Sequence, residues 1–144
     1  MPHHFLDDVA WADEAFVAQG RSLPELFESA ARALAEAQVD DLGAIRGEET
    51  REVRLESESA DGLLHAFLEE LVFLKDAERF IVGGVAARIT EREGRWNLDA
   101  SVTGDTIDPT RHKTVVDVKA ITWHRFEVAR TPEGGWRAQV VLDV

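Results

Sequence analysis

Acidic residues stand near both ends of this chain and have the chemistry to hold a hard cation. Asp13 lies at the start of a predicted strand, and Asp143 lies at the end of the last predicted strand, next to Val144. If the two strands are neighbours, the two side-chain carboxylates and the terminal carboxylate of Val144 could converge. Close carboxylates repel unless a positive charge lies between them. Such oxygen ligands suit Ca²⁺, Mg²⁺ or Mn²⁺; the alternative is that both aspartates are solvated acids at strand ends.

Two histidines form a second candidate group in the C-terminal part. His112 and His124 flank a predicted strand that contains Lys119. Imidazoles beside an acid could bind a transition metal, or one could act as an acid and base. The structural alternatives are a histidine that hydrogen-bonds a loop backbone and a lysine that pairs with an acid. Neither a Gly-x-Ser-x-Gly motif nor a P-loop accompanies them.

The polar loop before His112 carries two further acids, Asp105 and Asp108. An Asp-Pro pair favours a turn in which the aspartate side chain accepts backbone N–H groups. That structural role competes with contact to a ligand or a docking partner. The residues considered as partner or ligand contacts are Asp105, Asp108, Arg111, His112, Lys119 and His124.

Periodicity and turn residues predict the elements that position these groups. Ser22 and Glu25 have the spacing of a capping box, and apolar residues at helical spacing predict a helix over 23–38. A wider apolar stripe predicts a second helix over 62–77, with Asp61 as its cap. Alternating residues and turn signals predict strands over 14–20, around 53–55, and over 79–92, 95–103, 114–122, 125–131 and 136–143, with polar loops over 39–48 and 104–112.

This order of elements, β-α-β-α-β-β-β-β-β, predicts an α+β fold. Both helices are expected to pack on one face of a mostly antiparallel sheet. The chain has 144 residues with no linker or repeat, which fits a single domain over 1–144.

Composition narrows the classes of function. The sequence has no cysteine, so thiolate metal sites, disulfides and cysteine nucleophiles are excluded. Its 28 acidic and 16 basic residues give a net charge of −12, which disfavours direct binding to nucleic acid or an anionic membrane. No apolar run is long enough to span a bilayer, and no signal peptide is evident, so a cytoplasmic location is expected.

Taken in order, the motifs resemble those of the archease family, and the chain is identified as a divergent, bacterial-type member. The matching pieces run almost end to end: Ala12-Asp13, 22–31, Leu63-Leu64, 68–71, Gly104-Asp105, Asp108-Pro109, Arg111-His112, 118–124, Gly135-Trp136 and Leu142-Asp143-Val144. The fold and function that follow from this resemblance are expectations about the chain as a whole.

The resemblance implies a protein cofactor of an RtcB-type RNA ligase, active in tRNA splicing and RNA repair. Such a cofactor promotes guanylation of the ligase and multiple turnover, and is not itself an enzyme. The resemblance also implies a metal site, usually with Ca²⁺, at Asp13, Asp143 and Val144. Where many archeases have His-Thr-Ala-Asp, this chain has Ala10-Trp11-Ala12-Asp13, and a two-residue slip would bring Asp7 or Asp8 into that region.

Two other classes of function stay open at this point. One is a metal-dependent hydrolase built on Asp13, His112, His124 and Asp143, which requires these side chains around one metal or water. The other is a chaperone-like binding module without a metal, whose melting temperature would not respond to divalent cations.

Overall fold

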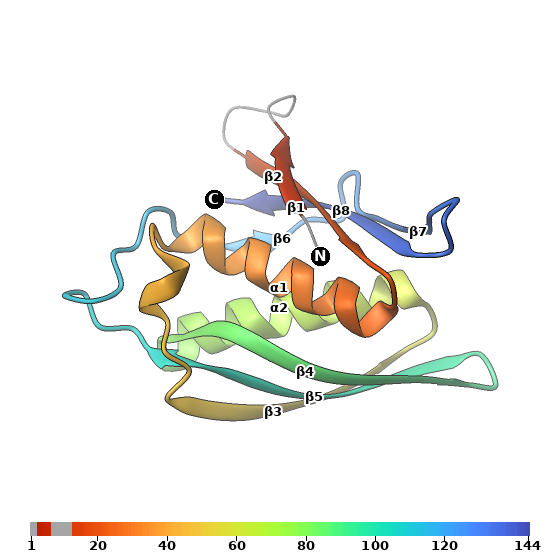
Figure 1. Ribbon diagram of the computed structural model, residues 1–144, viewed down its shortest axis with the longest axis horizontal. Coiled ribbons are helices and arrows are strands. Elements are labelled where there is room, and N and C mark those ends of the chain that lie inside the picture. The colour runs from red at the N-terminus through yellow and green to blue at the C-terminus, as the bar shows by residue number, and fades with distance from the viewer. Residues whose placement is uncertain (1–2, 7–12) are drawn as a thin grey trace.

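Two helices lie between two antiparallel sheets (Figure 1). The computed structural model describes residues 3–6 and 13–144. Within these residues, one sheet has the strand order β1-β2-β8-β6, with β7 also paired to β8, and the other has the order β3-β5-β4. The elements in chain order are β1 His3–Leu6, β2 Asp13–Gly20, α1 Leu23–Gln38, the 3₁₀ turn η1 Leu42–Ala44, β3 Glu49–Ser57, α2 Ala60–Glu78, β4 Phe80–Arg92, β5 Arg95–Thr106, β6 Ala120–Ile121, β7 Glu127–Arg130 and β8 Trp136–Asp143.

Local sequence signals explain where both helices begin. The Ser22 Oγ accepts the Glu25 N–H at 3.3 Å, as the predicted cap requires. The Glu25 carboxylate accepts the N–H of Arg21 at 2.8 Å, so the reciprocal half of the capping box falls one residue earlier than expected. For α2 the cap is Ser59, whose Oγ accepts the Gly62 N–H at 3.0 Å. Asp61 instead lies in the first turn, where its charge favours the helix dipole.

The predicted α+β class and the antiparallel pairing are confirmed, while the single sheet becomes two. The reason is the composition of α1, which is rich in alanine and buried on more than one face. A helix with one apolar stripe needs one covering layer, whereas a helix buried on opposite faces needs two. The strands therefore divide into two sheets, and the helices form the middle layer (Figure 1).

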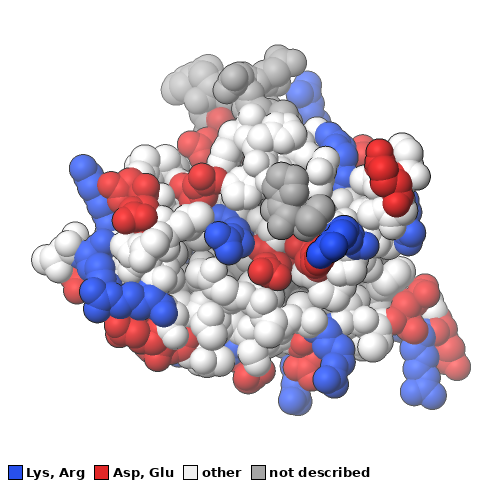
Figure 2. Space-filling view, viewed as in Figure 1, with Lys and Arg blue, Asp and Glu red and all other residues white. Residues whose placement is uncertain are grey.

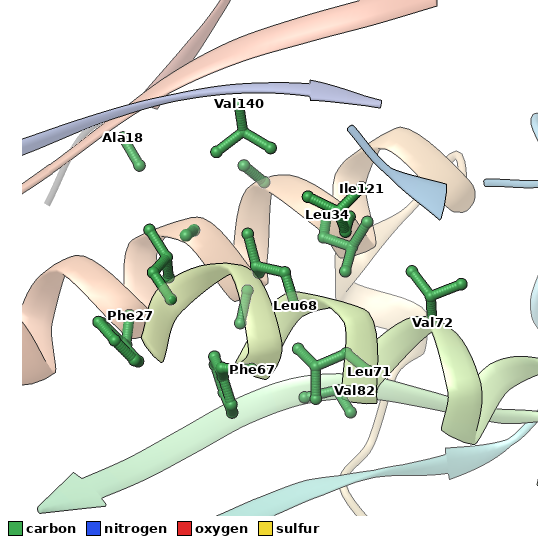
Figure 3. Close-up of a cluster of buried hydrophobic side chains, with 14 of the residues drawn as sticks. Ala18, Phe27, Leu34, Phe67, Leu68, Leu71, Val72, Val82, Ile121 and Val140 are labelled. Carbon is green, nitrogen blue, oxygen red and sulfur yellow. The ribbon is translucent and has the colours of Figure 1, made fainter. Parts of the chain in front are cut away.

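The core joins all three layers. Figure 3 shows side chains from both sheets, such as Val140 and Val82, pointing at the two helices. Phe27 of α1 stacks on Phe67 of α2 with ring centroids 5.5 Å apart. Each of these residues is at most 5% exposed, so the helix layer holds the two sheets together through one continuous apolar cluster.

Two predicted boundaries in the C-terminal half differ from the structure. The expected loop over 104–112 begins later, because β5 continues to Thr106 in register with β4. The expected strand over 114–122 is mostly irregular, and the short β6 is the part of it that pairs with β8. An isolated bridge joins Thr114 to Val39. The described part of the chain contains no helix with the length and apolar character needed to cross a membrane.

Candidate functional site

The strands that carry Asp13 and Asp143 are neighbours. In the antiparallel pair of β2 and β8, Asp13 stands directly opposite Asp143. Directly opposed residues present their side chains on the same face of a sheet. Phe16 of β2 and Leu142 of β8 point into the helix core, so the alternation of strand residues puts both aspartates on the other face. The predicted adjacency of the two strands is confirmed.

A third strand completes this edge of the sheet. Ala120 of β6 pairs with Asp143, and the N–H of Lys119 donates to the Asp143 carbonyl oxygen at 2.7 Å. Just past β6, the N–H of Thr122 donates to the Val141 oxygen at 3.0 Å. The Thr122 Oγ1 is buried and has no hydrogen-bond partner among residues 3–6 and 13–144. Continued alternation places Thr122 on the same face as Asp143, so an unpartnered oxygen accompanies the two carboxylates.

The oxygen atoms at this edge are the type of ligand that a hard cation prefers. Asp13, Asp143 and Val144 are half-buried, and neither aspartate side chain forms an ion pair or hydrogen bond with another described residue. The described residues contain no group of three or more His, Cys, Asp or Glu side chains able to hold a metal. A cation here would therefore rely on two side-chain carboxylates, backbone oxygens and water, which Ca²⁺ accepts more readily than a transition metal. Ala10-Trp11-Ala12, Asp7 and Asp8 lie outside the described residues.

A buried carboxylate, Asp105, organises the loop that follows η1. Its two oxygens accept the N–H groups of Arg46, Gly47 and Glu48 at 2.7, 2.8 and 3.0 Å. The His112 ring contributes a fourth bond from its Nε2 at 2.9 Å. Burial alone would raise the pKa of Asp105, but these donors lower it from 3.8 to about 2. Asp105 is therefore an anion that ties three segments of the chain together.

The tautomer of His112 follows from its two shortest hydrogen bonds. The N–H of Asp108 donates to His112 Nδ1 at 2.9 Å, so Nδ1 carries no proton. The proton of the neutral ring must then be on Nε2, which donates it to Asp105. Both residues are 1% exposed, so their hydrogen-bonding groups serve the interior. Among the residues predicted to contact a partner or ligand, only the more exposed ones could therefore touch a partner directly.

Those more exposed members are Asp108, Arg111, Lys119 and His124. The Asp108 Oδ1 accepts the N–H and hydroxyl of Thr110 at 3.0 and 2.7 Å, which is the turn that the Asp-Pro pair predicts. These bonds lower the pKa of Asp108. Arg111 is half-buried and donates to Asp105 at 3.3 Å. Lys119 and His124 are exposed.

Sequence reasoning missed one polar cluster, centred on His65 of α2. The buried imidazole donates from Nε2 to the Ile121 oxygen at 2.9 Å, and its Nδ1 lies 3.2 Å from a carboxylate oxygen of Glu69. The Trp123 ring stacks on it at 3.7 Å, yet that indole is 62% exposed. The spacing of His65 and Glu69, four residues apart on one helix, is the signal that could have found this pair.

The four residues of the hydrolase alternative do not assemble into one centre. Both nitrogens of His112 are engaged by Asp108 and Asp105, neither of which belongs to the strand pair of Asp13 and Asp143. His124 is exposed and joins no metal-binding group among the described residues. The hydrolase hypothesis required these side chains around one metal or water, and the structure contradicts it.

The fold and the chain-end carboxylates define a class of protein: an α+β domain with two helices between antiparallel sheets and an acidic edge where its first and last long strands meet. The family model described as "Archease protein family (MTH1598/TM1083)" matches residues 4–144, and the chain belongs to the archease family. This confirms the resemblance seen in the sequence.

Individual relatives support the same assignment. Protein archease of Thermococcus kodakarensis is 37% identical over 133 residues, which cover 92% of this chain and 93% of that protein. Protein archease of Pyrococcus furiosus is 35% identical with the same coverage. The solution structure of protein 1598 from Methanobacterium thermoautotrophicum has a TM-score of 0.85 at 32% identity, over 99% of this chain and 98% of that one. A Thermotoga maritima archease, described as a possible chaperone, shares the fold, with a TM-score of 0.59 at 18% identity over 99% of this chain and 100% of that one.

Proposed function

We propose that this chain is a non-catalytic accessory protein that activates an RtcB-type RNA ligase in tRNA splicing and RNA repair. In this role it promotes guanylation of the ligase and permits multiple turnover. The observation that carries the proposal is the register of β2 and β8, which sets Asp13 opposite Asp143 beside Val144, within a chain of the archease family. This acidic edge is the part of the molecule that a partner or its ligands would meet.

The acidic edge formed by Asp13, Asp143 and Val144, called the chain-end edge below, would hold one divalent cation. Ca²⁺ is the first candidate, and Mg²⁺ and Mn²⁺ are the others. Asp13, Asp143 and the backbone oxygens of Val144 would be its ligands, with Thr122 Oγ1 as a nearby neutral donor. The cation would neutralise the two opposed carboxylates and present positive charge to a phosphate or carboxylate. The protein's own part is to hold the two aspartates on one face of a rigid strand pair.

The surface charge suits a protein partner better than RNA. The chain carries a net charge of −12, and on the face in Figure 2 basic side chains are interspersed with acidic ones. An RNA-binding enzyme must carry basic surface to hold phosphates, so an acidic cofactor is attracted to it. Charge complementarity of this kind raises the association rate more than the final affinity, and it weakens as salt is added.

The test is a multiple-turnover ligation assay with the cognate RtcB-type ligase. The wild-type chain should raise turnover, Asp143→Asn should lose most of that effect, and Asp99→Asn, an exposed acid of β5, should keep it. Absence of stimulation by the wild-type chain, beside an active archease and ligase pair, refutes the accessory role. Equal stimulation by wild type and Asp143→Asn would keep the role but refute the part given to the cation.

A further inference from the structure

A pocket of about 400 Å³ opens at the C-terminal ends of both helices, apart from the chain-end edge. It is enclosed by the last residues of α1 and α2, the start of β4 and the irregular segment 107–117. Its apolar wall includes Ile81, Ile107 and Val116. Polar and charged side chains form the rest of the lining, and a pocket of this size is large enough for a small molecule.

Gln38, which lines this pocket, has a side-chain oxygen that accepts no hydrogen bond from the described residues. Its side chain is 4% exposed, and its Nε2 donates to the Leu34 carbonyl oxygen at 3.3 Å. That bond fixes the orientation of the amide, since a flipped amide would set two oxygens against each other. The Oε1 is buried and has no hydrogen-bond partner in the part of the chain that the structure describes. A buried acceptor left unsatisfied is costly, so a donor from a ligand would stabilise it.

The two cations of the pocket differ in what they already bind. Lys75 donates to Asp117 and to the Val118 oxygen and pairs with Asp76 at 2.9 Å. Burial lowers the pKa of Lys75, but its bonds to these acids raise it overall. The charge of Lys75 is thus fully engaged by protein groups.

Arg79 is the cation that remains available. Its backbone is fixed: its N–H caps α2, and its carbonyl oxygen accepts the Ile107 N–H at 2.7 Å. Its guanidinium is exposed and forms no ion pair or hydrogen bond with any residue that the structure describes. Arg79 lines the pocket, and the planar fork of a guanidinium matches the two oxygens of a carboxylate.

The surroundings favour a single negative charge on the ligand. Asp76 and Asp117 line the same pocket, and the carbonyl ends of both helices point toward it. A phosphate dianion would be repelled by these groups more strongly than a carboxylate. A ligand that complements these groups would therefore have one carboxylate, one N–H donor and an aliphatic part.

We propose that this pocket binds a small aliphatic carboxylate that carries an N–H donor, such as an N-acylated amino acid. The carboxylate pairs with Arg79, the N–H reaches the oxygen of Gln38, and the alkyl group packs on Ile81, Ile107 and Val116. This site is separate from the proposed ligase role, and either can fail without the other.

The test uses N-acetyl-L-leucine and the full chain, with affinity measured by calorimetry and the site mapped by amide NMR shifts. Saturable binding with shifts around residues 38, 79 and 107 is expected. N-acetyl-L-leucinamide, which lacks the anion, and 4-methylpentanoate, which lacks the N–H, should each bind at least about tenfold more weakly. A peptide ending in leucine distinguishes a free small molecule from the end of a protein chain as the natural source.

Matched variants make the assignment specific. Arg79→Gln should weaken binding of N-acetyl-L-leucine at least about tenfold, whereas Arg92→Gln, at another exposed arginine, should not. Gln38→Leu should abolish the preference for N-acetyl-L-leucine over 4-methylpentanoate and should raise the melting temperature, because it removes the unpartnered oxygen. No saturable binding to the wild-type chain, or affinities unchanged in Arg79→Gln and Gln38→Leu, would overturn the proposal.

Discussion

Replacing Asp105 by asparagine should separate the two kinds of stabilisation that this buried carboxylate provides. Its oxygens accept three backbone N–H groups, from Arg46, Gly47 and Glu48, and the Nε2–H of His112. An asparagine of the same shape has one accepting oxygen, and its NH₂ group would face donors. At least one buried N–H then loses its partner, and the charge that strengthens the other bonds is gone.

The magnitude follows from the pKa and from the lost bonds. A fall in the pKa of Asp105 from 3.8 to about 2 corresponds to about 2.5 kcal/mol of stability at neutral pH. The mispaired amide adds a further penalty of about 1–3 kcal/mol. The free energy of unfolding at pH 7 should therefore fall by about 3.5–5.5 kcal/mol in Asp105→Asn. Asp99→Asn, an exposed acid on the same strand, should change it by less than about 0.5 kcal/mol.

The pH dependence gives an independent measure. Because folding lowers the pKa of Asp105, its contribution is complete above the unfolded value of 3.8 and is lost as the pH falls toward 2. Urea unfolding of the wild-type chain should show this loss between about pH 5 and pH 2. Over the same pH interval the free energy of unfolding of Asp105→Asn should change less, since only the other carboxylates still titrate. If Asp105→Asn matches the wild type at pH 7, or keeps the full acid dependence, the role given to this carboxylate is refuted.

Three further predictions concern other parts of the fold. Ca²⁺ should raise the melting temperature of the wild-type chain and of Asp99→Asn but not of Asp143→Asn; a rise retained in Asp143→Asn argues against the chain-end site. Gly104→Ala should lower the free energy of unfolding by about 1–3 kcal/mol in urea, because its Cβ would stand 1.9 Å from the Ile81 oxygen, and an unchanged value would contradict that close approach. Lys75→Met should lower the free energy of unfolding by about 1–3 kcal/mol and speed hydrogen exchange of the Lys119 N–H, because Lys75 donates to the neighbouring Val118 oxygen. Exchange at the wild-type rate would show that Lys75 does not anchor the chain around Val118.

The sequence determined the helices well because their signals are local. The apolar spacing and Ser22 located α1 at 23–38, and α2 differs from its predicted range by two residues at its start and one at its end. The competing caps Ser59 and Asp61 are two residues apart, and composition cannot decide which side chain will reach the free N–H. The presence and approximate range of each helix were thus predictable. Which residue caps α2 depended on the path of the chain just before the helix.

The sheets and the polar contacts were less predictable because they depend on residues far apart in the chain. Alternation predicted most strands, yet alternation does not say which strands pair, and the division into two sheets followed from burial of α1 on opposite faces. Asp105 and His112 were identified as candidates by residue type and location. Their bond depends on how the loop between them folds, and the N–H groups of 46–48 reach Asp105 across nearly 60 residues.

The irregular segment 107–119 explains why polar residues are dense there. A strand would satisfy its backbone through a ladder, but this segment uses separate partners at successive points. The His112 Nδ1 accepts the Asp108 N–H, and the backbone carbonyl oxygen of Gln38 accepts the Val115 N–H. The Lys75 ammonium donates to the Val118 carbonyl oxygen. One residue later, the Lys119 N–H reaches Asp143.

These attachments give the segment a second consequence. It forms one wall of the pocket at the helix ends and then meets the chain-end carboxylates, so the two candidate sites share a continuous stretch of backbone. Residues whose types suggested catalysis, His112 above all, instead replace the missing ladder. The polar side chains of this segment therefore mainly satisfy backbone groups. Arg79 and Asp143, which lie beside the segment and whose side chains bind no described residue, are available for a ligand.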